Sequence, residues 1–208
     1  MYGILFSCQI ELTDNDVEFK GDTMKGIFAL IISLALLVPL NVSAQTYNLD
    51  PLHTTIDFKV KNMGFMHVTG AFEKFKGVVD IDQSDISKSK VAVSIETASI
   101  NTGINMRNKH LRSPDFFDAA KYPVMTFVST KIETGTEKNT LHVTGNLTIK
   151  GVTKPVTLLV EGPKNLQGDL KQGYSATATV NRQDFGVSWG AVIADEVFIT
   201  INTELVKQ

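Results

Sequence analysis

The dominant pattern after residue 54 is the alternation of apolar and polar side chains, one residue after the next. Between Thr54 and Lys61, the apolar residues Ile56, Phe58 and Val60 fall on one face, and charged or hydroxyl side chains fall on the other. A period of two in runs rich in β-branched and aromatic residues is typical of half-buried β-strands. We therefore predict a protein made mostly of β-strands.

Further segments show the same alternation or the same strand-like composition, and about eight strands are expected in all. These segments run over residues 67–82, 89–100, 123–133, 141–150, 155–162, 172–182 and 197–205. Short breaks that contain Gly or Pro, such as Lys150-Gly151 and Gly162-Pro163, separate several of them and favour antiparallel neighbours. About eight antiparallel strands can close into a barrel that holds one small ligand. A β-sandwich with a filled core is the alternative.

Small residues on the predicted inward faces favour a barrel with a lumen. Gly145, Ala176 and Ala178 stand where a packed core would contain bulky side chains. Bends in the strands, or large neighbours such as Phe72 and Tyr174, would explain the same small residues without a lumen. Both architectures therefore stay open at this point.

The alternation stops between Asn101 and Pro123. Within this segment, Ser113-Pro114-Asp115 has the order of a helix start, with a capping hydroxyl, a proline at the first helical position and an acid in the first turn. We predict an all-β fold with one or two short helices inserted near residues 105–120.

Residues 24–44 have the composition of an export signal. An apolar run from Ile27 to Val38 follows a lysine, and a site of small residues ends at Ala44. A run of about a dozen residues is shorter than the roughly 20 that span a bilayer. We predict cleavage after Ala44 and a mature protein that is periplasmic or secreted. A buried helix or a membrane anchor would also contain such a run.

The segment before Met24 does not fit the start of a signal peptide. A signal normally begins at the initiator methionine, whereas this segment carries the acidic residues Glu11, Asp14, Asp16, Glu18 and Asp22. We predict residues 1–23 to be a non-native upstream extension, 24–44 a signal peptide and 45–208 a single domain, large enough to bury its own core.

The composition of residues 45–208 argues against several classes of protein. Acidic and basic side chains are nearly equal in number, so we expect no basic face that would bind nucleic acid. The only cysteine, Cys8, lies outside this range, which excludes thiolate chemistry and cysteine metal sites in the domain. No second long apolar segment is present, so we expect no stable insertion into a membrane.

The residues with catalytic potential show no spacing that enzymes share. The histidines His53, His67, His110 and His142 form no metal-binding motif. No nucleophile elbow, phosphate loop or dinucleotide fingerprint occurs. We predict no catalytic residue, no metal and no cofactor. The alternative is an enzyme acting on a periplasmic lipid, with His53 or His110 and Asp115 as acid and base.

Charged and aromatic residues gather in the helical interruption and just before Phe185-Gly186. The charged ones are Arg107, Arg112, Asp115, Asp118, Arg182 and Asp184. The geometry of a guanidinium suits an anionic or polar ligand head. Ion pairs at the lip of a barrel, or bonds to loop carbonyls, would account for the same charges.

Several ordered motifs resemble the YceI-like family. They are TASINT at 97–102, Arg107 with HLRSPDFFD at 110–118, Tyr122-Pro123 with Phe127, GNLTIKGVTKPV at 145–156 and RQDFG at 182–186. The resemblance runs from about Tyr47 to Val206. Where family members have a histidine before Leu-Gly, this chain has Asn62-Met63-Gly64, which gives no support to a head-group role at position 62.

The resemblance implies an eight-stranded, lipocalin-like antiparallel barrel whose apolar pore binds a polyisoprenoid, an isoprenoid quinone or a similar long-chain lipid. It implies no cofactor and no catalysis. We expect the pore to open near Arg107 and Phe116. The residues expected to line the pore or its mouth are Phe58, Phe72, Arg107, Phe116, Phe117, Phe127, Tyr174, Arg182 and Trp189.

Two other kinds of partner are compatible with the sequence. Two barrels could pair as a homodimer, although no exposed apolar stripe demands it. The outer surface could also dock on a membrane-bound redox partner, which would make the protein an interaction module.

Overall fold

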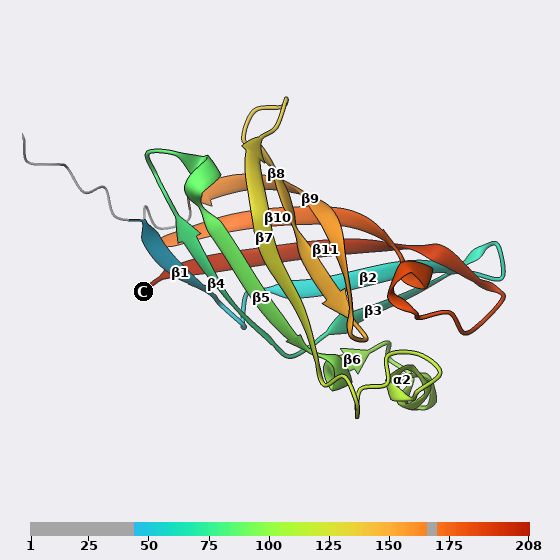
Figure 1. Ribbon diagram of the computed structural model, residues 1–208. Coiled ribbons are helices and arrows are strands. Elements are labelled where there is room, and N and C mark those ends of the chain that lie inside the picture. The colour runs from blue at the N-terminus through green and yellow to red at the C-terminus, as the bar shows by residue number, and fades with distance from the viewer. Residues whose placement is uncertain (1–43, 166–169) are drawn as a thin grey trace, which may run out of the picture. The chain divides into compact units, whose positions relative to one another are not determined.

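The computed structural model describes residues 44–165 and 170–208 (Figure 1). The predicted extension at 1–23 and all of the predicted signal peptide except Ala44 lie outside the described residues. Within the described part, no helix is long and apolar enough to cross a membrane.

Strands dominate the described residues, as the alternation predicts. The strands are β1 Gln45–Leu49, β2 Thr55–Asn62, β3 Met66–Phe72, β4 Phe75–Ile81, β5 Lys90–Glu96, β6 Ile100–Asn101, β7 Val124–Thr134, β8 Thr140–Ile149, β9 Val152–Asn165, β10 Lys171–Asn181 and β11 Ile193–Lys207. One α-helix, α2 Asn105–Arg112, and the short 3-10 helices η2 Ile86–Lys88, η3 Thr97–Ser99 and η4 Arg182–Phe185 complete the described elements.

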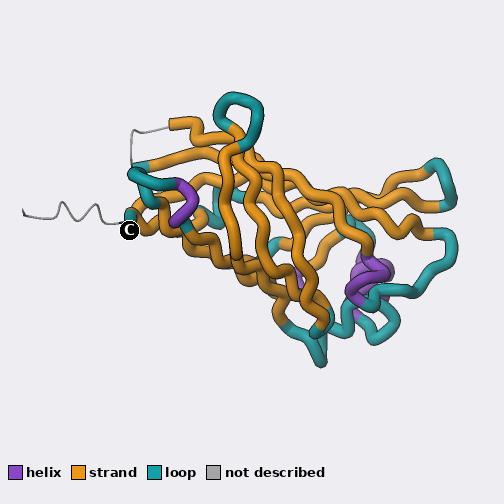
Figure 2. The backbone as a smooth tube through the Cα atoms, turned by 45° about the horizontal axis from the view of Figure 1, so that its top comes forward, coloured by secondary structure: helices purple, strands orange, loops and turns teal. Residues whose placement is uncertain are grey.

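Antiparallel pairing closes the strands into a barrel (Figures 1 and 2). The order around it is β1, β4, β5, β7, β8, β9, β10 and β11, and β11 returns to β1. The predicted eight-stranded antiparallel barrel is confirmed, and the sandwich alternative is wrong. Closure of the sheet removes the exposed edges that an open sheet would have.

The long strand β11 changes its neighbour along its length. Its first part, Ile193–Asn202, pairs with β2, whereas Leu205–Lys207 pairs with β1. β3 and β4 continue this division, because β3 pairs with β2 and β4 pairs with β1. The β2–β3 hairpin therefore extends the wall at one end of the barrel, where β3 pairs on its other side only with the two residues of β6.

The predicted strand at 89–100 is divided by η3, so that β5 ends at Glu96 and β6 begins at Ile100. Two further differences concern β1 and residues 67–82. β1 was not predicted, because five residues with Tyr47 and Leu49 as the only apolar ones are too few to establish a period. The predicted strand at 67–82 is divided into β3 and β4 at Glu73 and Lys74. Both differences fall where the chain passes from the β2–β3 end of the barrel to the β1–β4 end.

The predicted helix start at Ser113 is wrong, because α2 ends there. The backbone N–H and the hydroxyl of Ser113 both donate to the His110 carbonyl, at 3.0 and 2.7 Å. Pro114 follows and cannot continue the helix, and residues 114–117 form turns. A serine before a proline satisfies a helix end as well as a helix start, so the order of residues did not distinguish the two.

Candidate functional site

A cavity of about 340 Å³ lies inside the barrel. Side chains from β2, β3, β5, β7, β8, β9, β10 and β11 line it, together with α2, η4 and neighbouring turns, whereas β1 and β4 contribute none. Apart from the polar residues Asp57, Asn62, Arg107, His110 and Arg182, the lining is aliphatic or aromatic. Sites for small molecules commonly have volumes of roughly 300 to 1,000 Å³, so the cavity has the size of a ligand site.

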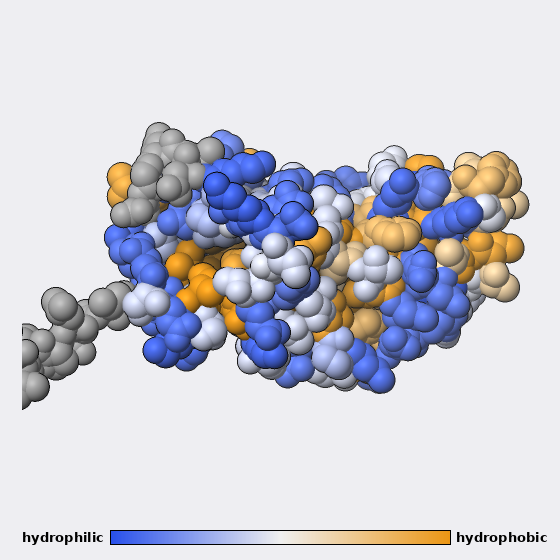
Figure 3. Space-filling view, turned by 90° about the horizontal axis from the view of Figure 1, so that it is seen from above, coloured by the Kyte–Doolittle hydropathy of each residue, from blue (hydrophilic) through white to orange (hydrophobic). Residues whose placement is uncertain are grey.

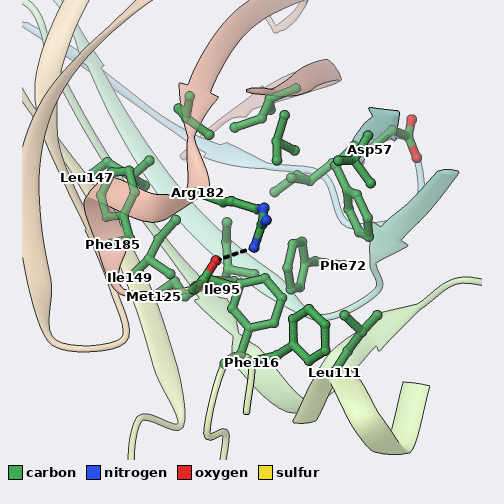
Figure 4. A pocket seen from close by; sticks show the side chains of 18 of the residues that line it. Asp57, Phe72, Ile95, Leu111, Phe116, Met125, Leu147, Ile149, Arg182 and Phe185 are labelled. Atoms are coloured by element: carbon green, nitrogen blue, oxygen red, sulfur yellow. Dashed lines mark hydrogen bonds between the residues drawn. The ribbon is translucent and has the colours of Figure 1, made fainter. Parts of the chain in front are cut away.

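The inward faces of the strands supply the aliphatic wall. Ile56 and Val60 of β2 and Val197, Ile199 and Ile201 of β11 all line the cavity, as their alternation predicts. Figure 4 shows further wall residues from β5, β7 and β8 around the same space, and it shows the Asp57 carboxylate turned away from them. The lumen that the small inward residues favoured is therefore present.

Gly145, however, is small for a different reason. A Cβ at this position would lie 2.5 Å from the Phe127 ring, and a Cβ at Gly70 would lie 2.6 Å from the Phe58 ring. Both glycines make room for an aromatic side chain that lines the cavity. The alternative explanation, a small residue beside a large neighbour, is the one the structure supports at Gly145.

The predicted aromatic residues of the pore come together from separate segments. The Phe72 ring lies 5.8 Å from Phe58 and 6.0 Å from Phe117, centroid to centroid. The Trp189 ring lies 5.3 Å from Phe116 and 4.6 Å from the His110 ring. All six of these rings line the cavity, as does Phe127.

Arg182 lines the cavity, but its polar group is engaged with backbone carbonyls and lies 3.2 Å from the Asp195 carboxylate. Its side chain is 7% exposed, and its five N–H groups donate to the carbonyls of Val187, Trp189, Gly190, Ile193 and Ala194 at 2.7 to 3.2 Å. One of the bonds of Arg182 is dashed in Figure 4. A guanidinium has only five donors, so Arg182 holds the loop before β11 and has none left for a ligand head.

Arg107 lines the cavity with donors to spare. Its Nε donates to the Thr102 hydroxyl at 2.8 Å and its Nη2 to the Thr102 carbonyl at 2.7 Å. None of the ion pairs among the described residues involves Arg107. Of the two arginines predicted to meet a ligand, Arg107 is the one whose geometry leaves N–H groups for it.

Asn62 lines the cavity, although no pattern in the sequence singles it out. Its Oδ1 atom is buried and has no hydrogen-bond partner in the described part of the chain. Burial of an unpaired polar atom is costly unless something else bonds to it.

His110 and Asp115 lie beside each other at the cavity. The His110 Nε2 and the Asp115 Oδ2 are 3.1 Å apart. The His110 ring also packs edge-on against Phe116, with 5.0 Å between centroids. The pair named in the enzyme alternative is therefore real, and its histidine lines the cavity.

Tyr174, the remaining predicted pore residue, does not line the cavity. It belongs to what we call the packed end, the group formed by Tyr47, Ile81, Gln172, Tyr174 and Leu205. The Tyr174 hydroxyl donates to the Gln172 Oε1 at 2.8 Å, and burial raises the pKa of Tyr174 to about 12. The Gln172 Nε2 donates to the Tyr47 hydroxyl at 3.4 Å. Here the barrel is filled with side chains.

At the other end, apolar side chains are exposed. We call Met63, Phe65, Met66, Trp189 and Val192 the rim, and at least half or nearly half of each is exposed. Figure 3 shows the apolar colour gathered at this end. The expectation that no exposed apolar stripe is present misses this group, because its members stand on two turns and not along one strand face.

One group of possible metal ligands lies outside the cavity. The ligand atoms of Asp50, His53 and Glu204 lie within 4.8 Å of one another. A hydrogen bond with His53 and one from the Leu52 backbone N–H hold the pKa of the Asp50 carboxyl below its usual value. Lys171 lies 3.7 Å from the Glu204 carboxylate and competes with any cation. The absence of a metal stays a prediction.

Comparison with known proteins gives a match over almost the whole barrel. The family model described as the YceI-like domain matches residues 47–205. A UPF0312 protein of Pseudomonas fluorescens strain SBW25 is 38% identical over 190 residues, which cover 88% of this chain and 98% of that protein. A UPF0312 protein of Pseudomonas putida strain W619 is 37% identical over the same length and shares.

Solved structures have the same fold. BcnA of Burkholderia cenocepacia matches with a TM-score of 0.69 and 31% identity, over 75% of this chain and 98% of that one. The YCEI protein of Campylobacter jejuni matches with a TM-score of 0.62 and 32% identity, over 71% and 89%. A polyisoprenoid binding domain of Saccharophagus degradans matches with a TM-score of 0.63 and 19% identity, over 79% and 99%.

Proposed function

We propose that this protein, which belongs to the YceI-like family, encloses a long-chain amphiphilic lipid of the isoprenoid kind in its barrel and stores or carries it unchanged. The observation that carries the proposal is the cavity of about 340 Å³ with its aliphatic and aromatic lining. The neighbour of the same fold from Saccharophagus degradans is described as binding polyisoprenoid. A polyisoprenoid or the tail of an isoprenoid quinone has the chemistry that this lining suits.

The tail of such a ligand supplies most of the affinity. Burial of a methylene gains about 0.8 kcal/mol, so roughly 20 carbons gain on the order of 16 kcal/mol, against an association cost of about 4 to 15 kcal/mol. A hydrogen bond to the head adds about 1 kcal/mol net. Arg107 and Asn62 would therefore orient the ligand, while the apolar wall holds it.

The chemistry of the lining supports binding over catalysis. None of the residues that line the described cavity is Ser, Thr, Cys, Lys or Tyr, the side chains that most often attack an ester or carbonyl. The N–H groups of Arg182 already donate to loop carbonyls, so this arginine has none with which to stabilise negative charge on a substrate. The rest of the lining is mostly aliphatic and aromatic, which suits the tail of a lipid.

A second candidate function, an enzyme acting on the lipid, is favoured by the contact between His110 and Asp115. The test is to incubate the purified protein with an isoprenoid ester or diphosphate and to follow the products by mass spectrometry. His110→Ala and Asp115→Asn would abolish turnover if the pair acts as acid and base. We expect no turnover with the unchanged protein, and turnover that depends on both residues would overturn the proposal.

The proposed location is the periplasm or the exterior, because residues 24–44 have the composition of a signal peptide. Amino-terminal sequencing of the protein from its native host tests this. We expect Gln45 as the first residue. A mature chain that retains Glu11 to Asp22 would contradict both the cleavage site and the interpretation of residues 1–23.

The test of ligand binding is mass spectrometry of the protein purified from its native host. We expect a co-purifying long-chain lipid in the native spectrum and in an organic extract. An empty barrel in repeated preparations, even after incubation with isoprenoid lipids, would overturn the proposal.

A matched pair of variants on β5 shows whether the lipid occupies the cavity. Ile95 lines the cavity, and Ile95→Trp would fill part of the space. Ala92 is exposed on the same strand, and Ala92→Trp places the same side chain outside. We expect Ile95→Trp to lose most of the bound lipid and Ala92→Trp to keep it. Equal lipid content in both would show that the lipid binds elsewhere.

A further inference from the structure

The rim presents large apolar side chains to solvent on two neighbouring turns. Phe65, on the β2–β3 turn, is 74% exposed, and Val192, in the loop before β11, is 60% exposed. The Met63 backbone N–H donates to the Val192 carbonyl at 2.8 Å, which joins the two turns. Both turns reach the same end of the barrel in Figures 1 and 2. The rim is therefore one surface built from two segments.

The segments that carry the rim contain no charged side chain. Residues 62–66 are Asn-Met-Gly-Phe-Met, and residues 186–194 run from Gly186 to Ala194 without Asp, Glu, Lys, Arg or His. Single exposed apolar residues are ordinary on protein surfaces, whereas a contiguous group marks an interaction site. Exposed Lys61, Asp195 and Glu196 flank the two segments with charges of both signs, so the apolar side chains, and not a charge of one sign, define the surface that a partner meets.

The loop that carries Trp189 and Val192 is held in place from below. Arg182 donates to the carbonyls of Val187, Trp189 and Gly190, so the apolar side chains project from a fixed backbone. A surface that is already ordered loses little conformational entropy when it meets a partner. The exposure of the rim is thus maintained by the fold.

The rim is continuous with the cavity. Trp189 belongs to both, and the cavity residues Asn62 and Ile193 adjoin the rim residues Met63 and Val192 in the chain. The His110 ring of α2 packs edge-on against the Trp189 ring. An apolar path therefore leads from the barrel interior to the exposed side chains.

We propose that the rim docks on the surface of a zwitterionic phospholipid bilayer, so that a lipid passes between membrane and cavity without crossing water. This inference rests on the proposed function, because an apolar path from rim to cavity serves lipid transfer only if the cavity binds a membrane lipid. Trp and Phe favour the boundary between headgroups and acyl chains. Because apolar side chains make the contact and the flanking charges are of both signs, docking needs no anionic lipid and salt should change it little.

Co-sedimentation with phosphatidylcholine vesicles tests the docking. We expect the protein to sediment with the vesicles, and added sodium chloride to leave the bound fraction nearly unchanged. Trp189 is the only tryptophan of the chain, so its fluorescence should shift to the blue and be quenched by lipids that carry bromine in the upper acyl chain. No sedimentation, or binding that requires anionic lipid, would overturn the proposal.

A matched pair of double variants locates the contact. Phe65→Ser with Val192→Ser removes two rim side chains that do not line the cavity. Leu52→Ser with Phe198→Ser removes two exposed apolar side chains away from the rim. We expect the vesicle partition coefficient to fall by about tenfold or more for the first pair and to stay unchanged for the second. An equal fall in both would overturn the assignment to the rim.

The outcomes for the lipid and for the membrane are independent. Ile95→Trp, which blocks the cavity, should still sediment with vesicles. A protein that sediments but never contains lipid would contradict the proposed function alone, and one that contains lipid but never sediments would contradict the docking alone. If the unchanged protein forms a dimer that Phe65→Ser with Val192→Ser dissociates, and shows no sedimentation, the rim belongs to a second copy and the docking is overturned.

Discussion

The packed end and the rim end of the barrel share strand β11 but differ in what they do with apolar side chains. At the packed end, Tyr47 is fully buried and its hydroxyl donates to Gln45 at 2.8 Å. At the rim, Phe65 and Val192 face solvent, and the neighbouring interior is a cavity. A closed barrel can therefore have a filled core or a pore. The side chains along its inner face determine which of the two forms.

The difference between the ends follows from which strands meet there. β1 and β4 bring Tyr47 and Ile81 against Leu205, and these fill the interior. β2 and β3 bring side chains such as Val60, Val68 and Phe72 to the wall of the cavity, where space remains between them. One end stabilises the protein, and the other leaves room for a ligand. Four changes test this division of roles.

The largest effect is expected from Tyr47→Ala at the packed end. Truncation of a fully buried aromatic residue leaves a cavity and should lower the free energy of unfolding by about 3 to 5 kcal/mol. Urea denaturation measures this. Phe65→Ala at the rim is the control and should change stability by less than about 0.5 kcal/mol. Similar losses at both sites would show that the two ends contribute equally to stability.

Arg182→Met should have the next largest effect. It leaves five loop carbonyls without their donor, which should cost about 3 kcal/mol. The loss should appear as a changed emission of Trp189 before the barrel unfolds in urea. Arg182→Lys should recover little, because an ammonium has three donors in a different geometry. Full recovery with lysine would mean that the charge alone matters.

The pH dependence of the packed end gives a smaller effect. Burial raises the pKa of Tyr174 to about 12, against about 10 for an unperturbed tyrosine, so the folded state keeps a proton that the unfolded chain loses. Stability should therefore fall as the pH rises from about 10 to 12, by at most about 2 kcal/mol after allowance for partial exposure.

Tyr174→Phe isolates this contribution from that of the lysines. Urea denaturation of both proteins at about pH 9 and about pH 11 should show a smaller decline in the variant. The same decline in both would show that the buried hydroxyl at the packed end does not resist ionisation.

The smallest effect is expected from Arg107→Met at the cavity. Loss of one head-group hydrogen bond should weaken the affinity for lipid by about fivefold, which corresponds to about 1 kcal/mol. Competition with a fluorescent fatty acid analogue measures this, and Ile95→Trp serves as the reference for full loss. If Arg107→Met matches Ile95→Trp, the head group and not the tail dominates binding.

The sequence predicted the parts of the fold that depend on a period. Alternation placed Ile56, Phe58 and Val60 on the inner face of β2, and all three line the cavity. It could not say where along the barrel an inward residue lies. Tyr174 points inward as expected, yet it packs beside Gln172 at the packed end.

The parts that were missed depend on contacts between distant segments. In the rim, one backbone hydrogen bond joins residues 62–66 to residues 186–194. A local sequence pattern cannot predict such a pairing of distant segments. The role of Arg182 was left open between a ligand head and a structural role in ion pairs or bonds to loop carbonyls. Only the folded loop brings five carbonyls and the Asp195 carboxylate around one guanidinium. Ser113 was misassigned because its bonds run backward to His110.

The change of neighbour along β11 makes partial opening of the barrel possible. The ladder between β2 and Ile193–Asn202 is separate from the ladder between β1 and Leu205–Lys207. Proteins open locally in cooperative units whose free energies lie below that of global unfolding. Because the two ladders are separate, we expect the β2–β3 hairpin to open independently of the β1 ladder. The residence time of a bulky ligand would then follow the frequency of this sub-global opening, which hydrogen exchange of the β2 amides measures.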